Sequence, residues 1–181
     1  IELISHRFFG DKQVFRIKLN NKNYKIETRL IGKIQLKNIL MAILAAKQSG
    51  IKIEKIIKVI HKIQPVEGRL ENIGKIKNHA RVILDYAHTP DALELSLLNL
   101  KEQFPSSKIS LVFGCGGERD FKKRSIMGRI ADKYADRIYL TDDNPRNENP
   151  LKIRRDIKKG IKKNKIREIP NRRKAIHESI M

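Results

Sequence analysis

From residue 81 onward, short apolar runs alternate with longer amphipathic segments, and this alternation limits most strongly what the chain can fold into. Strands that alternate with helices of this length run parallel and are joined by right-handed crossovers. The sequence therefore predicts an α/β fold with a doubly wound, mostly parallel sheet. The predicted strands are residues 81–86, 109–113, 137–141 and a short run near 167–169, and the predicted helices are about 90–103, 122–134, 150–163 and a last one opening near Asn171.

The first 66 residues follow a different pattern. Apolar and polar residues alternate on both sides of an Asn-rich turn at residues 20–23, which predicts a hairpin. The predicted elements are this hairpin over residues 13–31, a helix from Leu36 that ends at Gly50, and a second helix over about 53–63. Pro65 and Gly68 then break the pattern. We therefore expect two domains, residues 1–66 and residues 67–181.

The chain is strongly basic, with 40 Lys plus Arg against 20 Asp plus Glu and a formal charge of +20. Such an excess can attract nucleic acid or anionic lipid. However, lysines lie on the polar faces of every predicted helix, and aromatic residues make up only 6%. We therefore expect a solvated surface with no nucleic-acid or membrane partner, and a basic nucleic-acid-binding module stays as the alternative from another functional class.

Membrane-spanning and secretory signals are missing from the sequence. No run approaches the roughly 20 apolar residues that a transmembrane helix needs, and the first residues lack the charged-then-apolar pattern of a signal peptide. The single cysteine, Cys115, cannot form an internal disulfide. These observations favour a cytoplasmic protein.

Doubly wound sheets bind ligands beyond the carboxyl ends of their strands, which directs attention to three loops. The first follows Leu84 and runs from Asp85 to Asp91. Thr89 and Pro90 suit a helix start, so an ordinary strand-to-helix turn is one interpretation. Asp85 and His88 are not explained by capping, and beside a helix N-terminus they suit the ribose hydroxyls and phosphates of a nucleotide.

The second loop, residues 114–120, contains three glycines and is followed by basic residues at 122–124. Glycines allow the backbone to approach a ligand closely, and the cations suit an anionic ligand. The Gly-Lys-Ser/Thr ending of a P-loop is absent, and a flexible turn is the alternative. Without a partner at a suitable spacing, Cys115 is interpreted as a small structural residue rather than a nucleophile.

The third loop, residues 141–150, places acids, amides and an arginine between two prolines. Pro145 stiffens the turn that carries Arg146, and a guanidinium is well shaped to bind a carboxylate in two places. Metal binding by Asp142 and Asp143 is a less favoured alternative. A plain surface turn uses the same residue types, so the spacing alone leaves both interpretations open.

Several motifs in the same order resemble one family. They are GRLE at 68–71, DYAHTPD at 85–91, GCGGERD at 114–120 with KR at 123–124, MGRIA at 127–131 and DNPRNENP at 143–150. Together they resemble the UDP-N-acetylmuramyl-tripeptide synthetases of the Mur ligase family, and the segment 30–46 resembles the helix that ends the family's ATPase domain. The resemblance covers about residue 25 to the C-terminus. It implies a Rossmann-like C-terminal domain, preceded by the end of the ATPase domain.

The family joins an amino acid to a nucleotide-linked muramyl dipeptide. ATP, with Mg²⁺, phosphorylates the terminal carboxylate of the dipeptide, and the incoming amine attacks the acyl phosphate. The resemblance implies that Asn38 contacts the adenine and that Arg69 reaches the ribose or phosphates of ATP. It further implies that Asp85 binds the ribose hydroxyls and that His88 lines the same pocket.

The resemblance also implies an amino-acid site built from Arg119, Asp143, Asn144, Pro145 and Arg146. The DNPR form is similar to that of members that use meso-diaminopimelate, whose second carboxylate needs an arginine. Such a site rejects lysine, because a missing carboxylate leaves a desolvated arginine unpaired. A lysine-adding or a folylpolyglutamate-type ligase of the same superfamily is the runner-up.

The chain departs from the family pattern at four positions and lacks other parts of it. Glu118 and Ser125 stand where Asp and Pro are usual, and Asn147 and Asn149 flank Glu148 where Ser or Thr and an acid are more frequent. We expect the P-loop, the magnesium ligands, the carbamylated lysine and the UDP site to precede Ile1, and a Gly and a Glu of the amino-acid pocket to follow Met181. We therefore assign neither catalytic residues nor metal ligands, and expect a monomer that is inactive on its own.

Overall fold

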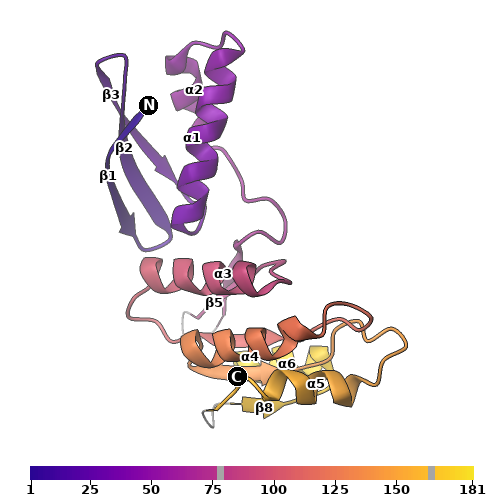
Figure 1. The fold of residues 1–181 in the computed structure, drawn as a ribbon. Coiled ribbons are helices and arrows are strands. Elements are labelled where there is room, and N and C mark those ends of the chain that lie inside the picture. Colours follow the sequence, from indigo (N-terminus) through magenta and orange to yellow (C-terminus); the bar gives the residue numbers. More distant parts are fainter. Residues whose placement is uncertain (77–79, 163–165) are drawn as a thin grey trace. The chain divides into compact units, whose positions relative to one another are not determined.

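The computed structural model describes residues 1–76, 80–162 and 166–181, which form two compact units (Figure 1). The first unit contains Ile1–Lys75, Arg81–Tyr86 and Asn99–Pro105. The second contains the described residues of Ile76–Ala80, Ala87–Leu98 and Ser106–Met181. Each unit has its own packed interior.

The first unit begins with an antiparallel sheet of β1 (Glu2–Phe9), β2 (Lys12–Leu19) and β3 (Lys22–Thr28), in that order. The strands β2 and β3 form the hairpin that the sequence predicts, joined at Asn20 and Asn21. Both asparagines have positive φ, 48° and 59°. Two-residue hairpin turns favour this conformation because its twist matches that of the strands, and asparagine tolerates it well.

Strand β1 is absent from the sequence prediction. It pairs with β2, and its register shifts between Leu3 and Ser5. Most of its residues are exposed, so neither face has to be apolar. Without a buried face, the period-two alternation that identifies a strand is missing from the sequence.

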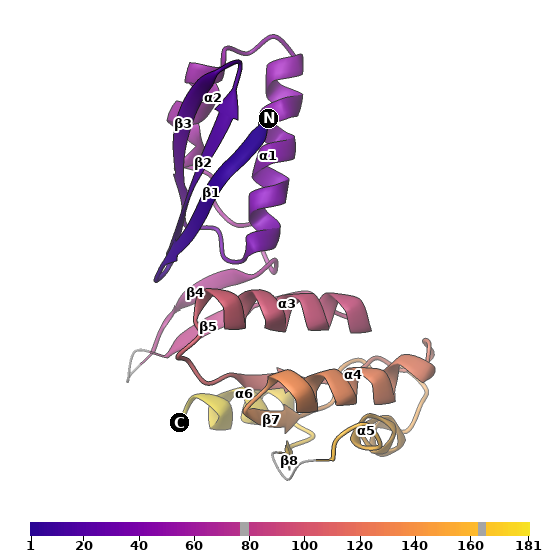
Figure 2. The same cartoon turned by 60° about the vertical axis from the view of Figure 1, so that its left-hand side comes forward.

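Two helices, α1 (Lys33–Gln48) and α2 (Ile53–Ile60), pack against this sheet (Figure 2). Both follow the predicted periodicity, and α2 ends three residues earlier than predicted. Their contact with β2 and β3 buries one apolar cluster. It consists of Phe15, Ile17, Ile26, Leu30, Leu36, Ile39, Ile43, Ile56 and Ile60.

The first turn of α1 is capped by side chains distant in sequence. The Gly32 amide donates to Gln103 Oε1 at 2.8 Å, and the Ile34 amide donates to Asn99 Oδ1 at 3.0 Å. Asn99 and Gln103 are both 4% exposed. Because the first amides of a helix lack intrahelical partners, these two buried side chains satisfy donors that would otherwise be stranded.

The segment 81–86 corrects one prediction. Instead of joining a parallel sheet, β5 (Arg81–Leu84) pairs antiparallel with β4 (Glu71–Lys75). Asp11 forms ion pairs with both Lys75 and Arg81, and these pairs hold the two strands to the first unit. Its pKa is lowered, since the hydrogen bonds from the two cations outweigh the effect of burial.

The second unit contains a parallel sheet of β6 (Ser110–Phe113), β7 (Arg137–Leu140) and β8 (Ile166–Glu168), in that order. Helix α4 (Lys122–Tyr134) connects the first two strands and α5 (Pro150–Lys158) the next two, so the predicted strand–helix alternation is confirmed here. Helix α3 (Pro90–Gln103) precedes the sheet and α6 (Arg172–Ile180) follows it. The predicted α/β class is therefore confirmed.

The interior of the second unit is formed by residues in or next to the three strands and by residues of four helices. Its buried members are Leu93, Leu97, Phe113, Cys115, Met127, Ile130, Ala131, Ala135, Ile138, Leu140, Ile153, Ile157 and, outside this cluster, Ala175. The helix starts agree with the sequence signals. Asn149 accepts from the Leu151 amide at 2.9 Å, Pro150 occupies the first turn of α5, and Asn171 accepts from the Lys174 amide at 2.9 Å.

Helix α5 ends at Lys158, and the predicted end, residue 163, lies outside the described residues. Gly160, which follows the helix, lies against α4. A Cβ atom on Gly160 would overlap the carbonyl oxygen of Ser125, and one on Gly128 would overlap the carbonyl oxygen of Ile157. The two helices thus approach at a distance that only glycine permits.

The predicted domain boundary between residues 66 and 67 stays a prediction. The strands β4 and β5, which follow this boundary, are counted with the first compact unit. Among the residues described, no helix combines the length and the apolarity needed to cross a bilayer.

Candidate functional site

Two loops leave the carboxyl edge of the parallel sheet side by side. Phe113 is in register with Leu140, so the loop after β6 (residues 114–121) and the loop after β7 (residues 141–149) start together. The Thr141 amide donates to the Phe113 carbonyl at 3.0 Å. We call these the glycine loop and the arginine loop. Together they form the candidate site, at the edge where sheets of this type bind ligands.

The glycines of the glycine loop make room for the arginine loop. A Cβ on Gly114 would overlap the carbonyl oxygen of Thr141, and a Cβ on Gly117 would overlap that of Pro145. The Gly117 amide also donates to the Asn144 carbonyl at 2.8 Å. The sequence prediction assigned these glycines to close approach of a ligand, whereas in the structure the close approach is between two backbones.

Arg146 lies over the glycine loop. Its Nη1 donates to the Gly117 carbonyl at 2.6 Å, and its residue is exposed. A guanidinium has five N–H donors, and this bond takes one of them. The backbone of Arg146 has a φ of 50°, in the left-handed region that few non-glycine residues adopt. The chain thus holds Arg146 in an uncommon conformation that brings its charge to the sheet edge.

Asn144 and Pro145 shape the turn that carries Arg146. Asn144 Oδ1 accepts from the Arg146 amide at 3.2 Å, and the Glu148 amide donates to the Pro145 carbonyl at 3.0 Å. Asp143 and Asn144 are exposed, next to the buried Thr141. The DNPR segment is therefore a turn fixed by hydrogen bonds of its own side chain and backbone, and Asp143, Asn144 and Arg146 are exposed on it.

Arg119 is exposed on the glycine loop, one residue after Glu118. Glu118 has a φ of 51°, and its Oε1 accepts from Asn147 Nδ2 at 2.7 Å. The next residue, Asp120, accepts from the Lys122 amide at 2.9 Å at the start of α4. Arg119 therefore stands between two points where its loop is fixed, one to the arginine loop and one to α4.

Glu148 connects the two loops to a buried arginine. Its Oε1 accepts from the Glu118 amide and, at 2.8 Å, from Arg124 Nη2. The Arg124 hydrogen bond, followed by that of the Glu118 amide, lowers the pKa of Glu148. The sequence prediction named Glu148 only as a position flanked by unusual residues and gave it no role.

Arg124 is 1% exposed on α4 and also contacts Asp156 Oδ2 at 3.3 Å and the Gly116 carbonyl at 3.5 Å. Within the described residues, its Nε has no hydrogen-bond partner. The hydrogen bond to Glu148 is the largest factor that raises the pKa of Arg124. Burying a guanidinium is costly unless carboxylates compensate it, and here two do.

A second buried arginine fixes the other end of the arginine loop. Arg154, 7% exposed on α5, forms ion pairs with Asp142 and, at 2.8 Å, with Glu168. Hydrogen bonds from Arg154 and Lys158 lower the pKa of Glu168.

Because the Arg154 guanidinium already forms an ion pair with the Asp142 carboxylate, metal binding by Asp142 and Asp143 loses support. Among the described residues, no group of three His, Cys, Asp or Glu residues could hold a metal ion.

The start of the first loop, Asp85 and Tyr86, is fixed within the first unit. Asp85 Oδ1 accepts from the Leu70 amide at 3.0 Å, and the Tyr86 amide donates to the Gly68 carbonyl at 2.7 Å. The Arg69 guanidinium lies 5.2 Å from the centre of the exposed Tyr86 ring. The Gly-Arg pair and the Asp85 turn, 16 residues apart in sequence, are thus neighbours in space.

The two other predicted nucleotide contacts, Asn38 and His88, are both exposed. Asn38 is exposed on α1, and its Nδ2 donates to Gln35 Oε1 at 3.1 Å. His88 belongs to the second unit and is exposed, and its carbonyl accepts from Lys123 Nζ at 2.7 Å. Thr89 Oγ1 accepts from the Ala92 amide at 3.3 Å, as expected of a helix cap.

Cys115 is a buried member of the core rather than an exposed nucleophile. It is 4% exposed, and its Sγ lies 3.7 Å from Met127 Sδ. Burial raises the pKa of its thiol to about 11. The thiolate is the reactive form, so this cysteine agrees with the structural interpretation made from the sequence.

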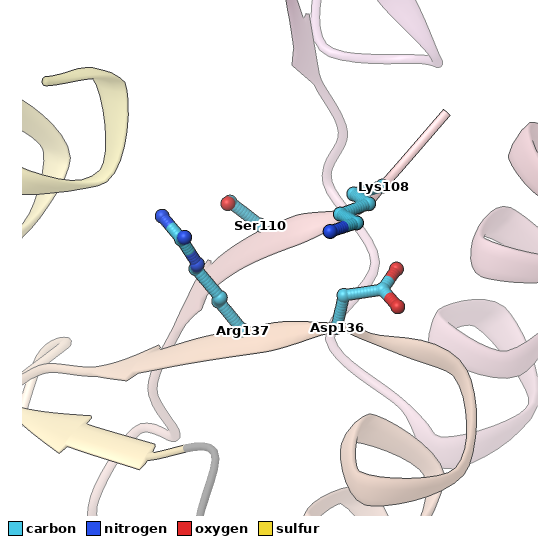
Figure 3. A pocket seen from close by; sticks show the side chains of 4 residues that line it. All are labelled: Lys108, Ser110, Asp136 and Arg137. Atoms are coloured by element: carbon cyan, nitrogen blue, oxygen red, sulfur yellow. The ribbon is translucent and has the colours of Figure 1, made fainter. Parts of the chain in front are cut away.

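A cavity of about 340 Å³ lies at the opposite edge of the parallel sheet (Figure 3). Lys108, Ser110, Asp136 and Arg137 line it, all at or just before the amino ends of β6 and β7. Asp136 Oδ2 accepts from the Ile109 amide at 2.9 Å, which joins the two strand starts. Because parallel sheets bind ligands at the carboxyl edge, this cavity is not the candidate site.

The chain is similar in sequence to known proteins. Residues 68–181 match the family described as Mur ligase, glutamate ligase domain. The UDP-N-acetylmuramoyl-L-alanyl-D-glutamate–2,6-diaminopimelate ligase of Rickettsia montanensis is 46% identical over 162 residues, which are 89% of this chain and 33% of that protein. The ligase of the same name from Buchnera aphidicola is 47% identical over 152 residues, 83% of this chain and 30% of that protein.

Solved structures resemble the chain as well. A structure of UDP-N-acetylmuramoyl-L-alanyl-D-glutamate–2,6-diaminopimelate ligase has a TM-score of 0.69 and 34% identity, and covers 96% of this chain and 36% of that one. A Mycobacterium tuberculosis folylpolyglutamate synthase complexed with ADP has a TM-score of 0.77 at 18% identity, and covers 98% of this chain and 39% of that one, so it shares the fold alone. The chain thus spans about a third of the length of the curated relatives it matches.

Proposed function

This chain belongs to the Mur ligase family, and we propose that it is part of an ATP-dependent ligase that adds meso-2,6-diaminopimelate to UDP-N-acetylmuramoyl-L-alanyl-D-glutamate in peptidoglycan precursor synthesis. The names of relatives 46% and 47% identical to it support this activity. Because the chain spans about a third of those relatives, the activity is proposed for the protein that contains it.

The observation that carries the proposal is the placement of Arg146. Its guanidinium lies over the glycine loop at the ligand-binding edge of the sheet, held by the Gly117 carbonyl at 2.6 Å. The remaining N–H donors suit a carboxylate, which a guanidinium can bind in two places. Meso-diaminopimelate has a carboxylate at each end, whereas lysine lacks the distal one.

The other proposed contacts to the amino acid surround Arg146. Arg119 supplies a second exposed cation from the glycine loop, which suits the second carboxylate. Asp143 is an exposed acid that suits an ammonium group, and Asn144 offers an amide. Pro145 restricts the turn, so that less conformational freedom is lost when the substrate binds.

Asn38, Arg69, Asp85 and His88 are each proposed to contact ATP, on the family resemblance. The surroundings of Asp85 and Arg69 fit a nucleotide: a carboxylate fixed by the Leu70 amide, an exposed cation and an exposed aromatic ring. ATP, assisted by Mg²⁺, would supply the phosphoryl group that activates the acceptor carboxylate. We propose that the Mg²⁺ ligands are residues of the protein other than these.

The role proposed for this chain is to hold the incoming amino acid. With both carboxylates bound by arginines, one amino group of meso-diaminopimelate is oriented toward the activated carboxyl group. Orientation of this kind makes an amine attack effectively intramolecular. A glycine- and arginine-lined site also keeps the substrate charged groups paired while the amine reacts.

The test is a substrate comparison with a full-length ligase that contains this sequence. UDP-N-acetylmuramoyl-L-alanyl-D-glutamate and ATP are supplied with meso-diaminopimelate, L-lysine or L-glutamate, and ADP release is measured. We expect meso-diaminopimelate to be preferred over lysine by about 10³-fold or more in kcat/KM, because lysine leaves an arginine unpaired. Equal use of lysine would reject the specificity, and use of glutamate with a folate acceptor would favour the folylpolyglutamate-type alternative.

A further inference from the structure

One carboxylate oxygen joins the two loops of the site to the core. Glu148 Oε1 accepts both the Glu118 amide of the glycine loop and Nη2 of Arg124 on α4. Glu148 itself belongs to the arginine loop, two residues after Arg146. A single atom therefore links the glycine loop, the arginine loop and a buried cation.

The link is stiff because Arg124 cannot move freely. The side chain is 1% exposed, and its other contacts are the Gly116 carbonyl and Asp156. Leaving such a guanidinium unpaired costs free energy, so the Glu148 carboxylate is held where Arg124 needs it. The Glu118 amide is a second donor to the same oxygen. Together the two donors fix the orientation of the Glu148 carboxylate.

Arg146 depends on both loops that Glu148 joins. Its backbone lies in the arginine loop, and its Nη1 donates to Gly117 in the glycine loop. A relative shift of the loops would change the direction of this guanidinium. Glu148 holds the loops together from one side, through Glu118, while the bond between Gly117 and the Asn144 carbonyl holds them from the other.

We propose that Glu148, anchored by Arg124, is a positioning residue that sets the direction of the Arg146 guanidinium toward the distal carboxylate of the amino-acid substrate. This inference rests on the proposed function for the identity of the substrate. Its geometric part, the coupling of the two loops, concerns the protein itself and is tested separately below.

The chain offers a matched control, because Arg124 has a second carboxylate partner. Asp156, on α5, contacts Arg124 Nη1 and makes no contact with either loop among the hydrogen bonds of the described residues. Asp156→Ala removes one carboxylate from Arg124, as Glu148→Ala does. If Arg124 has a purely structural role, both variants should have similar effects. If Glu148 positions Arg146, Glu148→Ala alone should weaken the binding of the amino acid.

The experiment compares Glu148→Ala, Glu148→Gln and Asp156→Ala in a full-length ligase that contains this sequence. We expect Glu148→Ala to raise KM for meso-diaminopimelate by about tenfold or more and to relax the selectivity against lysine, with KM for ATP within about twofold. Glu148→Gln keeps an oxygen acceptor and should recover most of the loss. Asp156→Ala should leave both KM values within about twofold of those of the unchanged enzyme. Equal effects of Glu148→Ala and Asp156→Ala, or equal loss for both substrates, would overturn the proposal.

Amide hydrogen exchange measured on the same proteins tests the geometry without any substrate. Glu148→Ala should accelerate exchange at the amides of Glu118, Arg146 and Asn147, and Asp156→Ala should not. If the unchanged enzyme fails to use meso-diaminopimelate, the proposed function fails, and the exchange pattern alone then decides whether Glu148 couples the loops. Unchanged exchange in Glu148→Ala would sink the inference whatever the substrate.

Discussion

The amide of Gly117 and the carbonyl of Asn144 are joined by a hydrogen bond of 2.8 Å, and through it the glycine loop and the arginine loop are in direct backbone contact. A methyl group on Gly117 would overlap the neighbouring Pro145 carbonyl. Glycine is required here by the other loop, before any ligand is considered.

Two alanine variants should separate packing from recognition. Gly117→Ala must push the loops apart, and we expect a loss of about 1–3 kcal/mol in the free energy of unfolding. At Gly116 the nearest atom to an added Cβ is Arg146 Nη1, at 3.1 Å, the end of a flexible side chain. Gly116→Ala should therefore keep the stability and weaken the binding of meso-diaminopimelate. Urea unfolding and substrate titration measure the two effects, and the reverse ranking in stability would contradict this packing.

Arg146 should govern selectivity between amino acids. In a full-length ligase that contains this sequence, we expect Arg146→Ala to lower kcat/KM for meso-diaminopimelate by about 100-fold and to leave KM for ATP unchanged. Arg146→Lys should recover only part of the loss, since an ammonium cannot bind a carboxylate in two places. Arg155→Ala, at an exposed arginine of α5, is the control. Unchanged selectivity in both Arg146 variants would remove Arg146 from the site.

Stability should fall in acid because several ion-paired carboxylates, Glu148, Glu168 and Asp156 among them, have lowered pKa values. The largest cause is Arg124 for Glu148, Arg154 for Glu168 and Lys159 for Asp156. A group whose pKa is lower in the folded state stabilises the protein above its unfolded pKa, and this contribution disappears as the pH falls through the folded pKa. We expect the free energy of unfolding to be constant above about pH 5 and to decline below it. Glu148→Gln should decline less steeply, and an equal slope in both proteins would show that Glu148 does not contribute.

Cys115 should resist thiol reagents while the protein is folded. Its pKa of about 11 and its burial leave little reactive thiolate near neutral pH. We expect a disulfide-exchange reagent at about pH 8 to label the protein only after unfolding in denaturant. Rapid labelling of the folded protein would show that the thiol is accessible and would reopen the nucleophile interpretation.

The charge of +20 leads to a prediction about nucleic acid. Contacts from scattered lysines are non-specific, so any binding of DNA by these 181 residues should be weak and should fall steeply between about 50 and 200 mM salt. Fluorescence anisotropy with a labelled duplex measures this. Tight binding that persists at the higher salt concentration, and is unaffected by Arg146→Ala, would favour the nucleic-acid-binding alternative.

Helices and the parallel strands were predictable because burial leaves a periodic pattern in the sequence. Helix α3 and helix α4 have the predicted bounds, and β6 and β7 differ by one residue at an end. Strand β1 is mostly exposed, and β4 contains a register shift at Gly74, so neither shows an alternating pattern. The antiparallel pairing of β5 depends on β4, which is why the sequence suggested a parallel partner instead.

The site was predictable where chemistry is carried by unusual residue types and not where it depends on burial. The glycine loop and the DNPR turn stand out in the sequence, and the structure brings these two loops into contact. The basic run at residues 122–124 was assigned to an anionic ligand, yet its Arg124 is buried against Glu148 and Asp156. Arg154 looks like any other basic residue of a basic chain, yet it is buried too. Only the packing of α4 and α5 against the sheet distinguishes these arginines from solvated ones.

The close contact between Gly128 and the end of α5 reaches beyond the two helices. Arg124 is carried by α4 and Arg154 by α5, so the spacing between these two anchors of the arginine loop is set by how closely the two helices pack. A bulkier side chain at Gly128 or Gly160, well away from any substrate, would spread those anchors apart. The first measurable effect of such a substitution would be poorer discrimination between two amino acids. Every residue proposed to contact the substrate would still be in place.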